Sequence, residues 1–282
     1  MIVDAHHHLW DPVATRHDWL ADVPALQRRF DLADFQQASA PHGVDASVLV
    51  QVLNSTPETE EFLQIAAAST GRIAGVVGWA DLTDPGIADE LARLKEQPGG
   101  SLLVGIRHLV PDEPDVNWLA RPDVQRGLAA VGAAGLVYDL LVRPQHLTAA
   151  IKITAALPNV RFVLDHGAKP DMATGSTQPW TKLIEELSRR PNVTCKLSGL
   201  VTEAGPVWSQ AKIAPYAGHL LEAFGPNRLM FGSDWPVCLL AASYAEVFGL
   251  ARALLTGLLS QSELDAVFGT NASLVYDLHP PH

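Results

Sequence analysis

The chain has 282 residues, 48% hydrophobic and 18% charged, a composition that can build a large globular core. Asp and Glu outnumber Lys and Arg by 31 to 20, and the resulting net charge of −11 disfavours nucleic acid and membrane surfaces as partners. No apolar stretch approaches the roughly 20 residues that span a bilayer, and no secretory signal pattern opens the chain, so we expect a cytoplasmic protein.

Eight short apolar runs, most of them rich in β-branched residues, recur along the whole chain. Most are continuous rather than alternating, which is typical of parallel strands covered on both faces. The predicted strands are residues 2–5, 46–52, 73–79, 102–106, 136–142, 161–164, 193–197 and 229–231.

Segments with helical signatures lie between these runs. The helix opening at Pro57 has acids in its first turn and Gly71 after its end. The others predicted are residues 87–95, 122–134, 144–157, 179–188 and 211–224, followed by two C-terminal helices at 244–259 and 261–276. Eight strand–helix units favour a closed parallel (β/α)₈ TIM barrel over an open sheet. No linker or change of composition divides the chain, so we expect one domain over residues 1–282.

Polar residues follow several of the predicted strands, at the end where barrel enzymes place their active sites. His6 and His8 end the first strand and, being two residues apart, can face one pocket while His7 faces elsewhere. His166 follows the sixth strand, and Asp234 follows the eighth. Long loops at residues 10–30, 112–121 and 169–178 would form the rim of this pocket.

Each of these residues has an ordinary structural explanation when taken alone. A lone His after a strand is commonly a hydrogen-bonded structural residue, and Asp234 could cap a helix or a turn. Their joint placement on three strands that converge in a closed barrel is what favours a catalytic site, with His6, His8, His166 and Asp234 as its members.

Three motifs resemble the amidohydrolase superfamily, and in particular its sugar-lactonase branch. They are DAHHHLWD at residues 4–11, LDHGAKP at 164–170 and MFGSDWP at 230–236. The branch includes lactonases of the L-fuconolactonase and L-rhamnonolactonase type and is related to 2-pyrone-4,6-dicarboxylate lactonase. The resemblance covers essentially the whole chain and implies a hydrolase that opens a sugar lactone in carbohydrate catabolism.

One departure from the superfamily pattern bears on metal content. Dinuclear members place a bridging Lys or Glu after the fourth strand and a His after the fifth, whereas this chain has Arg107-His108 and Tyr138-Asp139 there. A dinuclear centre is therefore not expected. The resemblance implies either no required cofactor or one divalent ion, zinc being the best match, held by His6, His8 and Asp234, with His166 as a further nitrogen donor.

The resemblance also implies how the ring ester would be attacked. Asp234 would take a proton from water and return one to the leaving oxygen, while the three histidines polarise the carbonyl and position the water. A free aspartic acid has a pKa of about 3.9, and cationic histidines would lower it further. A mechanism without metal therefore works best with neutral histidines, and a bound zinc ion offers another way to activate water.

Further residues near the strand ends are expected to bind substrate. Arg107 offers a rigid fork of donors, and the Tyr138 hydroxyl can both donate and accept. The remaining candidates are His108, Lys169, Trp10, Trp235 and Gln51. For Lys169, and for Lys196 on the seventh strand, pairing with Asp165 or another carboxylate is an equally good explanation. A neutral sugar lactone fits better than an aromatic dicarboxylate, because the strand ends supply Arg107 as their only arginine.

Two alternative functions stay open at this point. The first is a metal-dependent amidohydrolase or decarboxylase acting on a small carboxylic acid or amide, which should lose activity on chelation. The second is a barrel retained as a binding or scaffold protein, although a decayed site would be expected to have lost one of the four residues. The preferred sugar is open, and the protein could act as a monomer or a homodimer.

Overall fold

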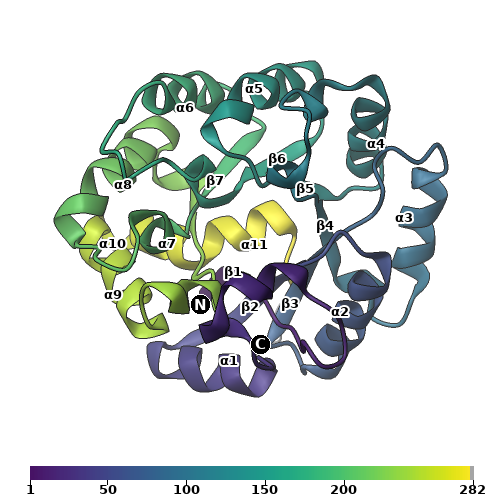
Figure 1. The fold of residues 1–282 in the computed structure, drawn as a ribbon, viewed down its shortest axis with the longest axis horizontal. Helices are drawn as coiled ribbons and strands as arrows, with labels where there is room; N and C mark the ends of the chain where they lie inside the picture. The colour runs from purple at the N-terminus through teal and green to yellow at the C-terminus, as the bar shows by residue number, and fades with distance from the viewer. Residues whose placement is uncertain (280–282) are drawn as a thin grey trace.

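Eight parallel strands form one sheet in which each strand pairs with the next along the chain (Figure 1). The structure, a computed structural model, describes residues 1–279. Its strands are β1 (Ile2–His7), β2 (Val44–Val50), β3 (Ile73–Gly78), β4 (Leu103–Arg107), β5 (Val137–Leu140), β6 (Arg161–Leu164), β7 (Val193–Leu197) and β8 (Leu229–Phe231). A parallel bridge between His7 and Trp235 brings the end of β8 back to β1. The predicted TIM barrel is confirmed, with every strand within two residues of its predicted bounds.

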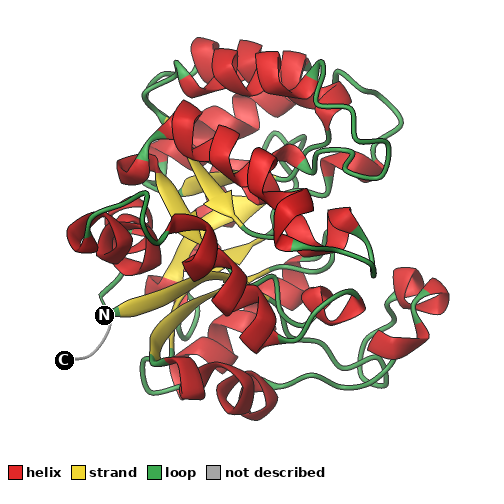
Figure 2. Cartoon of the chain, turned by 90° about the vertical axis from the view of Figure 1, so that its left-hand side faces the viewer, coloured by secondary structure: helices red, strands yellow, loops and turns green. Residues whose placement is uncertain are grey.

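Helices surround the strands, most of them on the outside of the barrel (Figure 2). They are α1 (Leu32–Ser39), α2 (Thr56–Ala68), α3 (Ile87–Glu96), α4 (Pro122–Ala133), α5 (Leu147–Ala156), α6 (Trp180–Ser188), α7 (Leu200–Ala204), α8 (Gln210–Phe224), α9 (Tyr244–Leu255), α10 (Gln261–Asp265) and α11 (Asn271–Tyr276). The sequence had not indicated α1 and α7. Helix α1 begins with a capping box between Asp31 and Asp34, a local signal in an otherwise irregular stretch. No helix among residues 1–279 is long and apolar enough to cross a membrane.

The barrel interior is apolar at one end and polar at the other. Val3, Val48 and Val137 belong to a buried cluster inside the strands, which Tyr276 of α11 joins. Figure 1 shows α11 lying across the middle of the barrel. Charged side chains from the strand ends are fully buried toward the other mouth, among them Lys196. The alternation of side chains along each strand decides which residues point into the barrel and which pack against the helices.

A buried carboxylate joins β2 to α2. The side chain of Glu58 is 6% exposed, and its Oε2 accepts the backbone N–H groups of Val52 (2.8 Å) and Leu53 (2.9 Å). Burial raises the pKa of Glu58 to about 7, although the two hydrogen bonds from the backbone lower it in part. The folded protein therefore binds a proton at Glu58 more tightly than the unfolded chain does.

We expect the unfolding free energy of Glu58→Gln, compared with that of wild type, to increase as pH rises. An acid whose pKa is raised from 4.5 to about 7 on folding favours the folded state fully only below about pH 4.5, and the stability it contributes falls as pH rises toward 7. The difference in unfolding free energy between Glu58→Gln and wild type should change over that window by up to about 3 kcal/mol. Urea unfolding between pH 5 and 8 measures it. Glu61→Gln, at an exposed site on the same helix, should show no comparable trend.

Candidate active site

Strand β1 delivers two histidines to the polar mouth of the barrel. The Nε2 atoms of His6 and His8 lie 3.1 Å apart, and both side chains are buried. His7 points the other way, stacks on Phe35 with ring centroids 3.9 Å apart, and contacts the Ser47 hydroxyl at 3.0 Å. The predicted separation of His7 from the pair is therefore observed, as the alternation of an extended strand requires.

Asp234 lies in the turn after β8, which hydrogen bonds fix to β1. Its backbone N–H donates to the carbonyl of His6 at 2.9 Å, and Asp234 has φ 59°, in the left-handed region. The carboxylate of Asp4 accepts the N–H groups of Ser233 (2.9 Å) and His6 (3.1 Å). Gly232 allows this close approach, because a Cβ there would lie 2.7 Å from the His6 Cβ. The turn carrying Asp234 and the strand carrying His6 therefore form one connected unit.

His166 lies in a tight turn after β6 with φ 54°. Its Nδ1 contacts the Ser198 hydroxyl at 2.8 Å, and the Trp180 indole holds the turn by donating to the Gly167 carbonyl at 2.7 Å. Gly199 has φ 65°, and a Cβ there would lie 2.6 Å from His166 Nδ1. A glycine is therefore required beside the imidazole for two reasons, conformation and space.

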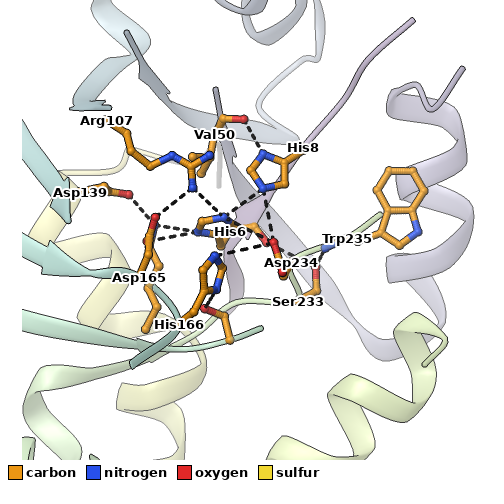
Figure 3. A network of polar contacts seen from close by, with 12 residues as sticks. His6, His8, Val50, Arg107, Asp139, Asp165, His166, Ser233, Asp234 and Trp235 are labelled. Carbon is orange, nitrogen blue, oxygen red and sulfur yellow. Dashed lines mark hydrogen bonds and ion pairs between the residues drawn. The ribbon is translucent and has the colours of Figure 1, made fainter. Parts of the chain in front are cut away.

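The four predicted catalytic residues meet around one carboxylate oxygen (Figure 3). Asp234 Oδ1 lies 3.4 Å from His8 Nε2, 3.7 Å from His6 Nε2 and 3.9 Å from His166 Nε2. All four side chains are at least 94% buried. Residues from β1, from the end of β6 and from the end of β8 thus converge, as the closed barrel predicted.

The tautomer of His8 follows from its partner. Its Nδ1 lies 2.8 Å from the Val50 carbonyl oxygen, which can only accept, so Nδ1 carries a proton. In a neutral His8 the Nε2 lone pair then points at His6 Nε2 and Asp234 Oδ1. A proton or a cation between these three atoms removes the repulsion between their lone pairs. The cluster is therefore suited to hold positive charge.

A charged network beneath the histidines positions His6. His6 Nδ1 lies 3.2 Å from Lys196 Nζ and 3.3 Å from Asp165 Oδ1. Lys196 also pairs with Asp165 at 3.0 Å and with Asp139 at 2.6 Å, and all of these side chains are fully buried. The Tyr276 hydroxyl donates to Asp139 at 2.8 Å. The pairing of Lys196 with Asp165, one of the two explanations that the sequence left open, is thus present, and this lysine is enclosed by protein.

The protonation of the cluster follows from burial and from neighbouring charges. Burial lowers the pKa of His166 to about 4 and holds that of His6 well below its usual value, so both are neutral at neutral pH. Burial opposes ionisation of Asp234, but His166, His8 and His6 outweigh it and hold the pKa of its carboxyl below the usual range. The site therefore combines an ionised Asp234 with neutral His6 and His166.

A cavity of about 470 Å³ lies behind Trp10, and a second of about 300 Å³ lies over the histidine cluster. The second is the candidate active-site cavity, because His8, His166 and Asp234 line it. Its volume is at the lower end of small-molecule sites. The side chains around its wall are Trp10, Trp19, Val52, Arg107, Leu109, Pro111, Asp112, Leu141, Arg143, Lys169 and Val237.

Arg107 lines the cavity, but protein groups occupy its donors. Its Nε and Nη2 donate to Gln51 Oε1 at 3.1 and 2.8 Å, and Nη2 also reaches the Gln51 carbonyl. Nη1 donates to Asp165 at 3.0 Å and lies 3.3 Å from His6 Nε2. Gln51 and Asp165 thus accept from four of its five N–H groups, and the fifth lies beside His6 Nε2. Gln51, predicted to bind substrate, is fully buried and holds Arg107.

The structure does not bring Tyr138 to the cavity. Its neighbours on β5, Val137 and Asp139, face the barrel interior, so Tyr138 points outward and packs edge-on against Phe162. The error is one of side-chain alternation: the sequence placed Tyr138 at the strand end without deciding which face it occupies. Its predicted contact with substrate is therefore corrected.

His108 and Trp235 also lie outside the cavity lining. His108 stacks on Trp118 with ring centroids 4.1 Å apart and contacts Glu113 at 2.7 Å. Trp235 is 3% exposed and packs against Phe30 and Phe35. Both support the rim rather than facing the cavity, and these two predictions are corrected.

Two other predicted residues do line the cavity. Trp10 is held by its indole N–H, which donates to the Leu26 carbonyl at 3.2 Å. Lys169 faces the cavity and pairs with Glu203 at 3.1 Å. Sequence reasoning missed Arg143 and Trp19, which come from loops after β5 and β1. The only feature of the sequence that could have indicated these two residues is their position in segments that follow predicted strands.

Known proteins and a family model match nearly the whole length of the chain. A family model described as an amidohydrolase matches residues 3–278. The L-fucono-1,5-lactonase of Burkholderia multivorans is 37% identical, over 99% of this chain and 97% of its own length. The enzyme of the same name from Burkholderia ambifaria is 34% identical, over 99% and 96%. A crystal structure of a Burkholderia multivorans amidohydrolase with bound zinc superimposes with a TM-score of 0.93, at 36% identity, over 99% of this chain and 100% of that one.

Proposed function

The chain belongs to the amidohydrolase family, and from that premise we propose that it hydrolyses the ring ester of a sugar lactone, of the L-fuconolactone kind. The observation that carries the proposal is the contact of the Asp234 carboxylate with three imidazoles, all within 4 Å, at a small-molecule cavity. Relatives named as sugar lactonases match nearly the full length of the chain, which supports the same reaction.

In this proposal Asp234 acts as the base. Hydrolysis of a lactone needs a proton removed from water, a polarised ester carbonyl and a proton for the leaving alkoxide. Asp234 is ionised at neutral pH and can take the first proton. It can return that proton to the ring oxygen when the acyl C–O bond breaks. Because its pKa is low, transfer to it becomes favourable only as water bonds to the acyl carbon and its proton becomes acidic.

The histidines are proposed to orient water and carbonyl. His8 keeps its proton on Nδ1 and presents Nε2 to the cavity, and Ser198 fixes the ring of His166. Arg107 supplies positive charge beside His6, although its N–H groups donate to protein atoms rather than to the substrate. The acyl oxygen would gain negative charge near these groups, which are already ordered before substrate arrives.

The donor set also fits one divalent ion. Tetrahedral zinc with bonds of about 2.0–2.1 Å requires ligand atoms about 3.3 Å apart. His6 Nε2, His8 Nε2 and Asp234 Oδ1 lie 3.1, 3.4 and 3.7 Å from one another, and His166 lies beside them. These residues would hold the ion. When bound, it would polarise a carbonyl and lower the pKa of water. We propose a site for one zinc-like ion, with the lactonase reaction not strictly dependent on it.

The test is a screen of stereoisomeric aldono-1,4- and 1,5-lactones with a pH indicator, before and after rigorous chelation. We expect ester hydrolysis of at least one sugar lactone, with most of the rate surviving chelation. Complete loss on chelation, with recovery on adding zinc, would keep the lactonase proposal and reject metal independence. A protein inert toward the whole panel, with and without metal, would overturn the proposed function.

A further inference from the structure

The cavity over the histidine cluster is lined by three cationic side chains, Arg107, Arg143 and Lys169. Protein groups account for the donors of Arg107, and Lys169 pairs with Glu203. Arg143 is different: its side chain is exposed, and among residues 1–279 no carboxylate or other acceptor takes a hydrogen bond from its guanidinium N–H groups. Asp112 lines the same cavity without pairing with it. Arg143 is therefore available to a ligand.

A short fixed turn presents this arginine. The Arg143 backbone N–H donates to the ring Nδ1 of His146 at 3.1 Å, and its carbonyl accepts the His146 N–H at 2.9 Å. Pro144 between them restricts the backbone further. The base of the side chain is thus held in place while the guanidinium reaches the cavity.

Arg143 stands across the barrel mouth from the reacting groups. It follows β5, and in a ring of eight strands in chain order β5 lies opposite β1, the strand that carries His6 and His8. A lactone whose ester lies between the histidines and Asp234 would extend its far end toward Arg143. The cavity of about 300 Å³ is small enough for one molecule to contact both sides.

We propose that Arg143 binds a carboxylate at the end of the substrate remote from the ester, so that the enzyme also opens monolactones of sugar dicarboxylic acids. This inference rests on the proposed function and names a substrate class for it. A guanidinium binds a carboxylate through two parallel, charge-assisted hydrogen bonds, which no neutral hydroxymethyl group can match. The prediction that only Arg107 supplies an arginine to the pocket is thereby corrected.

The reaction balances in the same way as for a neutral lactone. Water adds its oxygen to the acyl carbon, the bond from that carbon to the ring oxygen breaks, and the ring oxygen receives a proton. The product carries two carboxylates, the new one at the histidine cluster and the original one at Arg143.

The test compares two lactones that differ only at C6: galactono-1,4-lactone, with a hydroxymethyl group, and galactaro-1,4-lactone, with a carboxylate. We expect wild type to show the higher kcat/KM for the acidic lactone. Arg143→Gln should lower the acidic-to-neutral ratio of kcat/KM by about 10- to 100-fold, the range for losing a hydrogen-bonded charge pair. Arg189→Gln, an exposed arginine at the end of α6, should leave the ratio unchanged.

Binding provides a readout independent of turnover. Open-chain galactarate and galactonate are titrated calorimetrically into wild type and Arg143→Gln, and we expect galactarate to bind wild type more tightly and to lose that advantage in the variant. Equal loss for both ligands, or no loss, would overturn the inference. Suppose that the neutral lactone is hydrolysed, but Arg143→Gln changes neither the acidic-to-neutral ratio of kcat/KM nor the preference for galactarate over galactonate in binding. This inference then fails and the proposed function stands. If neither lactone nor any other in the panel reacts, the proposed function fails, and calorimetry alone decides on Arg143.

Discussion

Replacing Asp234 by Asn is expected to reduce lactone turnover by at least about 1,000-fold, the upper part of the range for losing a general acid–base group. An amide has nearly the shape of the carboxylate but cannot take a proton from water. It also removes the negative charge that His6, His8 and His166 surround. Both consequences fall on the reacting step, so kcat should decline more than KM rises. Initial rates over a range of lactone concentration separate the two.

The substitution is chosen so that folding is preserved. Asp234 has φ 59°, and Asn is one of the few residues that tolerate the left-handed region well. The turn is held by the backbone bond to His6 and by Asp4, neither of which changes. Asp171→Asn, an exposed carboxylate in the loop after His166, is the matched control and should keep nearly full activity. Retention of most of the activity in Asp234→Asn would show that another group is the base.

Replacing Lys196 by Met is expected to destabilise the protein by about 3–5 kcal/mol, the cost of removing one partner from a buried ion pair. Lys196 is the only cation within 4 Å of Asp139 among residues 1–279, at 2.6 Å, and it also pairs with Asp165 at 3.0 Å. Methionine fills a similar volume but leaves two buried carboxylates with less positive charge beside them. His6 also loses the ammonium at its Nδ1, so the surviving folded fraction should be less active.

Urea unfolding at neutral pH measures the effect of Lys196→Met. The control is Lys182→Met, an exposed lysine on α6, where surface substitutions usually change stability by less than about 0.5 kcal/mol. A second variant, Tyr276→Phe, removes only the hydroxyl that donates to Asp139 and should be destabilised by a smaller amount. Equal stability of Lys196→Met and wild type would show that the buried network does not require its cation.

Much of the fold could be predicted from the sequence because parallel strands buried on both faces are continuous apolar runs. The bounds of β6, β7 and β8 agree with the prediction to the residue. The C-terminal end of β1 was less clear, because the strand continues through His6 and His7, which are polar but buried. Helix α7 has five residues between two glycines, too short to show a helical period.

The convergence of the three histidines on Asp234 was predictable because these residues sit at strand ends, where position along the chain determines position in space. The direction in which each side chain points from its strand was harder to predict. Tyr138 and His108 follow inward-pointing neighbours, and one residue of alternation takes each away from the cavity. Arg143 directly follows the predicted fifth strand, residues 136–142, but sequence position alone does not show that its side chain reaches the cavity, which depends on the turn to His146. The Lys196 network depends on contacts among β1, β5, β6 and β7 that only closure of the barrel creates.

Hydrolysis in ¹⁸O-labelled water shows whether Asp234 directs water to the acyl carbon of a sugar lactone. Mass spectrometry of the product made by wild type should find one heavy oxygen, in the new carboxylate, and its rate of incorporation should fall by at least about 1,000-fold in Asp234→Asn. Label in the released hydroxyl group would show that water does not attack the acyl carbon, and labelling by Asp234→Asn as fast as by wild type would show that Asp234 does not direct it.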